Sequence, residues 1–351
     1  MHLQNTAALM ARKMRADEFD SYAVLVGING EESLLTSPDV NEDTYFDIAS
    51  MGKVLVTSTL ALKAVGIGKL TLAATLADFF PHTPDDKRAI TLHQLLTHTS
   101  GIVRDSIPAY VAAAGSEAIA RHILGNPLAY KPGTNYVYSC HGFILMGFIL
   151  EKVFGDTLDE VFYTHLRNPL HLTRSRFNIA TDEPDAAPCY TRAEIGMLRV
   201  DDDNVYKMGG IAGSGASFWT LADLRTYVRA ALAKSEALYR HDLFDQAEVN
   251  YTPDFSEGRG LGYLIVDMKY KQAGALFPLG SFGHCGHTGT SFFMNRERDL
   301  YAIVLTNATR FLKMKSGFTT YDYEAIKTMR ADIHTAIARD LNDQNVLDRT
   351  I

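Results

Sequence analysis

Strand-forming patterns are confined to the two ends of this chain of 351 residues. Near the N-terminus, the apolar run 22–28 and the segment Glu32-Ser-Leu-Leu35 flank Asn29-Gly30, a dipeptide that favours the tight turn of a β-hairpin. Near the C-terminus, three further runs alternate or stay apolar between turn residues: 262–267, 292–294 and 300–306. We therefore expect one antiparallel sheet assembled from both ends of the chain.

The long middle of the chain has helical rather than strand periodicity. Apolar residues recur at helical spacing over five segments: 54–65, 90–97, 116–124, 141–154 and 221–232. An amphipathic segment ending near 18 and another at 323–341 predict a first and a last helix. These patterns predict an α+β fold in which the two terminal helices flank the sheet and a mostly helical lobe is inserted.

The same patterns predict two domains. Residues 1–65 and 255–351 form the sheet domain, and residues 66–254 form the inserted, mainly helical domain. We expect the active site at the interface between them, where loops from both domains meet.

Composition excludes several classes of protein. With 46% apolar and 21% charged residues the chain is neither disordered nor fibrous. The net charge is −7 and Lys and Arg are scattered, so we expect no nucleic-acid partner and no anionic membrane partner. The longest apolar run, 143–150, is shorter than the ~20 residues of a membrane-spanning helix.

The N-terminus and the cysteines point to the same compartment. The first residues lack the basic start and apolar core of an export signal. Three cysteines without paired spacing predict free thiols rather than a disulfide framework: Cys140, Cys189 and Cys285. We therefore expect a cytoplasmic protein.

Ser50-Met-Gly-Lys53 is the one Ser-x-x-Lys sequence in the chain, and it opens the predicted helix over 54–65. Residues three apart share a helix face, so Lys53 would lie beside the Ser50 hydroxyl. A lysine whose pKa is lowered by burial can take the proton of a serine nucleophile. The alternative is that Ser50 only caps the helix and Lys53 is a solvated charge.

Tyr138 is a candidate partner of this pair. It follows a Pro132-Gly133 turn and precedes the apolar helix at 141–154. A tyrosine near an ammonium group can act as a general base or a proton relay. In a chain with 17 tyrosines, a packing role is the alternative.

The glycine-rich segment 282–291 is the second candidate, because glycines let a ligand lie against a strand. The backbone N–H after Gly286, with that of Ser50, would form an oxyanion hole, and His284 would hydrogen-bond the tetrahedral intermediate or the base. Metal binding by His284, Cys285 and His287 is disfavoured because their spacing fits no usual tetrahedral site. A plain strand with polar histidines is the remaining alternative.

Five sequence blocks, in order, resemble the serine β-lactamase and penicillin-binding-protein superfamily, in particular its class C β-lactamase-like esterases and peptidases. Phe46–Lys53 resembles the nucleophile motif of that superfamily, and Ile90–Gly101 a stretch typical of this branch. The other blocks are Tyr130–Tyr138, Gly209–Gly213 leading to Trp219–Asp223, and the His284 segment. The resemblance covers most of the chain and implies the same antiparallel sheet with a helical lobe.

The resemblance implies an acyl-enzyme reaction without metal or cofactor. Ser50 would be the acylated nucleophile, Lys53 its proton acceptor and Tyr138 the base shared by acylation and deacylation. His284-Cys285-Gly286 would be the counterpart of Lys-Thr-Gly. The backbone amides of Ser50 and His287 would supply the oxyanion hole.

Two departures from the family pattern bear on the substrate. Cys140 stands where Tyr-x-Asn has its amide, and His284 replaces a lysine that would supply a permanent positive charge. Both favour hydrolysis of a small ester or amide. The alternatives are a D-amino-acid peptidase, a weak β-lactamase, or a catalytically impaired covalent sensor or binding protein. A cysteine nucleophile beside His284 is disfavoured, since neighbours on a strand point to opposite faces.

Overall fold

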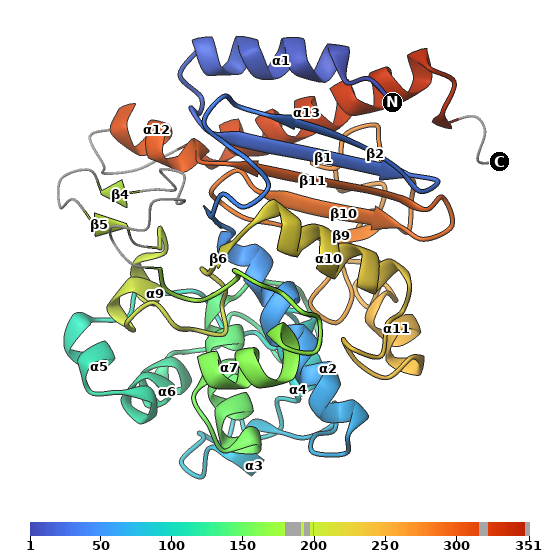
Figure 1. Ribbon diagram of the computed structural model, residues 1–351. Helices are drawn as coiled ribbons and strands as arrows, with labels where there is room; N and C mark the ends of the chain where they lie inside the picture. The colour runs from blue at the N-terminus through green and yellow to red at the C-terminus, as the bar shows by residue number, and fades with distance from the viewer. Residues whose placement is uncertain (180–190, 193–196, 199, 316–321, 348–351) are drawn as a thin grey trace.

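The computed structural model describes residues 1–179, 191–192, 197–198, 200–315 and 322–347 (Figure 1). Its centre is a seven-stranded sheet in the order β2-β1-β11-β10-β9-β8-β7, with every neighbouring pair antiparallel. The strands are β1 (Tyr22–Ile28), β2 (Glu31–Thr36), β7 (Gly258–Arg259), β8 (Leu264–Ile265), β9 (Phe282–Cys285), β10 (Ser291–Asn295) and β11 (Leu300–Thr306). Because β1 pairs with β11, the predicted antiparallel sheet built from both chain ends is confirmed.

The N-terminal hairpin forms at the predicted turn. Asn29 and Gly30 have φ values of 52° and 79°, the left-handed conformation that a two-residue hairpin turn requires. The strand expected at 262–267 is shorter, because only Leu264 and Ile265 pair with neighbouring strands. Its partner β7 has two residues, too few for an alternating pattern to be visible in the sequence.

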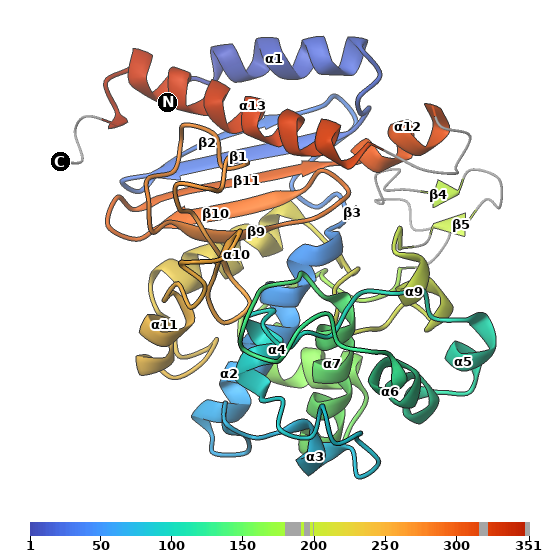
Figure 2. The same ribbon diagram turned by 180° about the vertical axis from the view of Figure 1, so that it is seen from behind.

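Helices α1 (Gln4–Arg15) and α13 (Tyr323–Asp343) lie together on one face of the sheet (Figures 1 and 2). Alternate residues of β11 reach opposite cores: Ala302 and Val304 join the core beneath these two helices, and Ile303 and Leu305 the core on the other face. The buried Asp340 carboxylate on α13 accepts hydrogen bonds from the Thr6 amide (2.9 Å) and hydroxyl (2.6 Å) on α1. The first and last helices are thereby joined.

The other face carries α10 (Leu221–Leu232) and, beyond it, the helical lobe. The remaining helices are α2 (Thr59–Gly66), α3 (Leu76–Phe79), α4 (Leu92–Leu96), α5 (Ala109–Ala113), α6 (Ser116–Gly125), α7 (Cys140–Phe154), α8 (Leu158–Phe162), α9 (Asp203–Lys207), α11 (Asp242–Ala247) and α12 (Ala308–Lys315). Two short ribbons complete the fold: β3 (Phe46–Asp47) with β6 (Phe218–Trp219), and β4 (Thr191–Arg192) with β5 (Met197–Leu198). Although α10 falls within the range 66–254, it packs on β10 and β11; the domain boundaries themselves stay a prediction.

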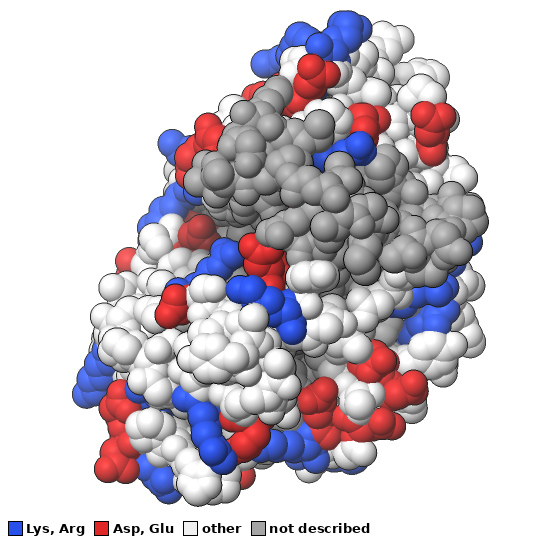
Figure 3. All heavy atoms as spheres, turned by 90° about the vertical axis from the view of Figure 1, so that its left-hand side faces the viewer, with Lys and Arg blue, Asp and Glu red and all other residues white. Residues whose placement is uncertain are grey.

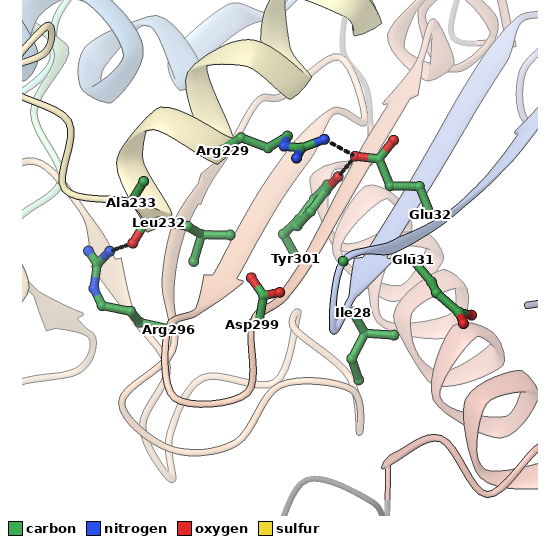
Figure 4. A pocket seen from close by; sticks show the side chains of 10 residues that line it. Ile28, Glu31, Glu32, Arg229, Leu232, Ala233, Arg296, Asp299 and Tyr301 are labelled. Atoms are coloured by element: carbon green, nitrogen blue, oxygen red, sulfur yellow. Dashed lines mark hydrogen bonds and ion pairs between the residues drawn. The ribbon is translucent and has the colours of Figure 1, made fainter.

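Charged side chains attach α10 to the edge of the sheet, as Figure 4 shows. Arg229 on α10 and the Tyr301 hydroxyl on β11 both donate to Glu32 on β2. Arg296, after β10, donates to the Leu232 carbonyl at the C-terminal end of α10. These residues border a surface pocket of about 280 Å³. The C-terminal part of α10 is thus fixed over the sheet.

Surface charge and hydropathy agree with the composition. On the face shown in Figure 3, basic and acidic side chains lie side by side over the described residues. Among the helices that the structure describes, none combines the length and apolar character needed to cross a bilayer.

Candidate active site

Ser50 lies where the chain changes from one helix type to another. A 3-10 turn, η1 (Ala49–Met51), is followed by a π-helical segment, η2 (Lys53–Ser58), which continues into α2. Short π-helical segments are rare in proteins, and those that occur are often found at functional sites. The residue before the serine, Ala49, has φ 47°, an uncommon conformation for a residue with a side chain.

Buried polar contacts fix this turn. The Asp47 carboxylate accepts hydrogen bonds from the amides of Ala49 (2.8 Å) and Asp201 (2.7 Å). Burial raises the pKa of Asp47 to about 6. On the other side, the Ala216 amide donates to the Ala49 carbonyl (2.9 Å), and a Cβ on Gly215 would lie 2.4 Å from that oxygen. Because Gly215 (φ 109°) has no side chain, the 209–216 segment packs directly against the turn that carries Ser50, which we call the nucleophile turn.

Lys53 is fully buried beside the serine. Its Nζ lies 3.1 Å from Ser50 Oγ, 2.5 Å from the Ser214 carbonyl oxygen and 3.4 Å from Cys140 Sγ. Burial lowers the pKa of the Lys53 ammonium, because the charged form loses its hydration. The structure thus brings together a serine hydroxyl and an amine suited to accepting its proton.

Tyr138 completes this group from the loop before α7. A hydrogen bond links it to Ser50, and Lys53 Nζ lies 5.0 Å from the centre of its ring. Burial raises the pKa of Tyr138 well above its ordinary value, and the nearby Cys140 raises it further. Tyr138 is therefore a neutral phenol at rest, able to donate a proton.

His98 holds the loop that carries Tyr138. Its ring packs 4.6 Å from the Tyr138 ring, and its Nδ1 accepts a hydrogen bond from the Ser139 amide (3.1 Å). Its backbone carbonyl accepts from the Tyr130 hydroxyl and from the Val137 amide, both at 3.1 Å. His98 was not predicted as a site residue from the sequence; the signal for it was its position within the Ile90–Gly101 block.

The ring of His284 hydrogen-bonds two groups of the protein. Its Nδ1 lies 2.9 Å from the Cys285 carbonyl oxygen, which can only accept, so Nδ1 carries the proton. Nε2 then accepts from Arg259 Nη1 at 3.3 Å. Burial and the charges of Arg259 and Lys53 hold the pKa of His284 well below its usual range. Both nitrogens of His284 thus have partners within the protein, and the role predicted for it, a hydrogen bond to the intermediate or the base, stays a prediction.

Arg259 places a permanent cation beside His284, the residue that replaces the lysine of the family pattern. Its Nη2 donates to the Tyr136 hydroxyl (2.8 Å) and to Glu257 (2.5 Å), and the guanidinium carbon lies 5.3 Å from the centre of the Tyr138 ring. The guanidinium is buried, whereas Glu257 is partly exposed. Sequence reasoning missed Arg259 because it lies outside all five sequence blocks; the two charges flanking Gly258 were the available signal.

Ser50, Tyr138, Arg259 and His284 border a cavity of about 350 Å³, and the remaining predicted residues that the structure describes lie at or beside it. Cys140 and Cys285 are free buried thiols, and the Cys285 sulfur lies 3.1 Å from the Tyr270 hydroxyl; Cys189 falls outside the described residues. A Cβ on Gly286 would lie 2.5 Å from the Ile48 carbonyl oxygen, so the end of β9 runs close to the nucleophile turn. The side chain of His287 hydrogen-bonds the buried Asp201 carboxylate at 2.5 Å.

The chemistry available here is nucleophilic and electrostatic. Eight residues that bear on it line the cavity: Ser50, Tyr138, Cys140, Glu257, Arg259, His284, Cys285 and His287. Across the described part of the chain, no three His, Cys, Asp or Glu side chains are grouped closely enough to hold a metal ion.

Comparisons with known proteins agree with this geometry. A family model described as "Beta-lactamase" matches residues 6–320. The chain is 26% identical over 302 residues to the "Putative D-alanyl-D-alanine carboxypeptidase" of Escherichia coli (strain K12), covering 75% of this chain and 69% of that protein.

Two solved structures show the same fold. A class C beta-lactamase in complex with cefoxitin superposes with a TM-score of 0.75 at 17% identity, covering 94% of this chain and 97% of that one. EstCE1, described as a hydrolase with promiscuous acyltransferase activity, gives 0.71 at 19% identity, covering 94% and 98%.

Proposed function

Because the chain belongs to the beta-lactamase family, we propose that it is a serine hydrolase that cleaves a small ester or amide through an acyl-enzyme on Ser50. The family and the relatives reported above are hydrolases of the serine β-lactamase fold. The observation that carries the proposal is the contact of 3.1 Å between the fully buried Lys53 amine and the Ser50 hydroxyl.

The directions of the pKa shifts support one assignment of the proton transfers. Burial lowers the pKa of Lys53 and raises that of Tyr138, so in both groups it shifts the protonation equilibrium toward the neutral form. Lys53 accepts the Ser50 proton as Oγ attacks the carbonyl, and Tyr138 donates a proton to the leaving group. The amides of Ser50 and His287 stabilise the oxyanion. Water then releases the acyl group by the reverse proton transfers.

Covalent labelling tests the proposal directly. The protein is treated with a fluorophosphonate and, separately, with p-nitrophenyl acetate, and the modified peptide is identified by mass spectrometry. We expect a stable phosphonyl adduct on Ser50 and continuing release of p-nitrophenol. Absence of both would contradict the proposal, and an adduct without turnover would favour the covalent sensor.

The pH dependence of kcat/KM is a further expected result. Activity requires the amine form of Lys53, so it rises with pH as the ammonium loses its proton. Since burial lowers the pKa of Lys53, the midpoint of this rising limb of the pH profile lies below the ordinary lysine pKa of 10.5. Because the pKa of Tyr138 is raised, activity does not fall again up to about pH 10. Rates of ester hydrolysis from pH 5 to 10 measure the profile; a limb at the ordinary lysine value would contradict it.

Arg259 favours a second candidate, a peptidase that releases a D-amino acid with a free carboxylate. A buried guanidinium bordering the cavity matches a carboxylate on the leaving group. The carboxypeptidase named among the relatives supports the same candidate. Turnover of a chromogenic cephalosporin would instead favour the β-lactamase alternative.

Substitution of Arg259 separates the ester and peptidase candidates. With a pair of substrates that differ only by a free or esterified carboxylate, we expect Arg259→Lys to reduce kcat/KM for the free acid about 10-fold more than for the ester. Arg240→Lys, on an exposed arginine paired with Asp242, is the control and should change neither value. Equal losses on both substrates would remove the peptidase candidate.

A further inference from the structure

A second buried arginine contacts the peptide group between Gly286 and His287 from the opposite side of the sheet. Arg330 lies on α13, the helix that crosses in front of the sheet in Figure 2, and its side chain is fully buried. Its Nη2 donates to the Gly286 carbonyl oxygen at 2.6 Å, and its Nη1 donates to Gln272 Oε1. The mechanism above gives Arg330 no part.

The position of this hydrogen bond has a consequence for the oxyanion hole. The Gly286 carbonyl and the His287 N–H belong to one peptide group, and the described chain has no cis peptide bonds, so the two point in opposite directions. A donor that fixes the carbonyl toward α13 therefore fixes the N–H toward the other side, where Gly286 runs close to Ile48 and Ala49 of the nucleophile turn. The Gly289 amide also donates to the Gly286 carbonyl, at 3.2 Å.

The charge of Arg330 adds to this effect, because it makes the His287 N–H a stronger hydrogen-bond donor. Its hydrogen-bond partners are neutral: the Gly286 carbonyl, the Gln272 amide and the Tyr323 hydroxyl. Within the described ranges, no Asp or Glu forms a hydrogen bond or an ion pair with it. A charged donor on a carbonyl polarises the peptide and makes its N–H a stronger donor, and a buried site enhances this effect.

We propose that Arg330 is a positioning residue that orients and polarises the 286–287 peptide, and so strengthens the oxyanion hole for the acyl transfer at Ser50. This inference rests on the proposed function. It predicts that loss of the Arg330 charge weakens binding of the transition state more than binding of the substrate.

The test uses Arg330→Met, which removes the charge, and Arg330→Lys, which keeps the charge but not the two-pronged geometry. We expect Arg330→Met to lower kcat for p-nitrophenyl acetate by about 10-fold or more with KM within about twofold, and to weaken inhibition by an aryl boronic acid by a similar factor. Arg330→Lys should retain an intermediate rate. Arg339→Met, on an exposed arginine of the same helix, is the control and should match the unsubstituted protein.

An infrared measurement separates polarisation from a general loss of structure. Hydrogen bonds to an ester carbonyl lower its stretching frequency, so the isotope-edited carbonyl band of the acyl-enzyme should move to higher frequency in Arg330→Met. If that variant does not fold, Arg330→Lys should show a smaller shift in the same direction. An unchanged band and unchanged boronic acid affinity in a folded Arg330 variant would overturn the inference about Arg330 and leave the proposed function unaffected. Failure of the unsubstituted protein to form an acyl-enzyme on Ser50 would overturn the proposed function, and the inference with it.

Discussion

Ser50→Ala is expected to abolish the acyl-enzyme and to lower ester hydrolysis by about 10⁴-fold or more, because it removes the hydroxyl that lies 3.1 Å from Lys53 Nζ. The fold should be unaffected. Lys53 keeps its hydrogen bond to the Ser214 carbonyl, so the variant loses one hydrogen bond, which contributes about 1 kcal/mol to stability. Fluorophosphonate labelling, the rate of p-nitrophenol release and the thermal unfolding midpoint measure the three expectations.

A matched control for this variant is Ser116→Ala, on an exposed serine at the start of α6. It should retain labelling and full activity. If Ser50→Ala is still acylated, the nucleophile lies elsewhere and the proposed mechanism is wrong. If the variant is unlabelled yet hydrolyses the ester at the original rate, then the turnover does not pass through an acyl-enzyme.

Lys53→Met is expected to lower kcat/KM by about 10³-fold, since it removes the proton acceptor but preserves most of the side-chain volume. The stability of the same variant should be equal or higher. An amine with a lowered pKa is fully buried at this position, and replacing a buried ionisable group by an apolar one often stabilises a protein. Activity and stability would therefore change in opposite directions, as expected where a strained site serves catalysis.

The control for Lys53→Met is Lys63→Met. Lys63 lies on α2, burial also lowers its pKa, and its Nζ donates to the Ala237 carbonyl rather than to Ser50. Its loss should leave the ester hydrolysis rate within about twofold, because it makes no contact with the reacting groups. A large loss of activity in both variants, with lowered unfolding midpoints, would show that lysines in this region act through stability.

Sequence reasoning was most successful where the relevant contacts are local. Ser50 and Lys53 are three residues apart, and the hairpin turn is set by Asn29 and Gly30, so short-range geometry determines both. Arg259 and His284 are 25 residues apart, and Arg330 and Gly286 are 44 apart. Their contacts depend on strand order and on which face α13 covers, and no local pattern encodes either.

The surroundings of His284 show the same dependence on distant residues. Its immediate neighbours in the sequence suggested a polar group facing the substrate, but Arg259 on β7 donates a hydrogen bond to its Nε2. A histidine beside a buried guanidinium is kept neutral, so its protonation is decided by a residue of a different strand.

The pairing of β1 with β11 has a consequence for how the protein is made. During synthesis the N-terminal hairpin emerges first, yet one edge of β1 has no partner until residues 300–306 have left the ribosome. An apolar strand with an open edge is an aggregation hazard while it waits. Contacts between such distant segments also slow folding, because a large loop must close before they form. A truncation before β11 would therefore leave Ser50, Lys53 and Tyr138 in the chain but remove the strand beside β10, and we expect such a fragment to depend on chaperones rather than to fold alone.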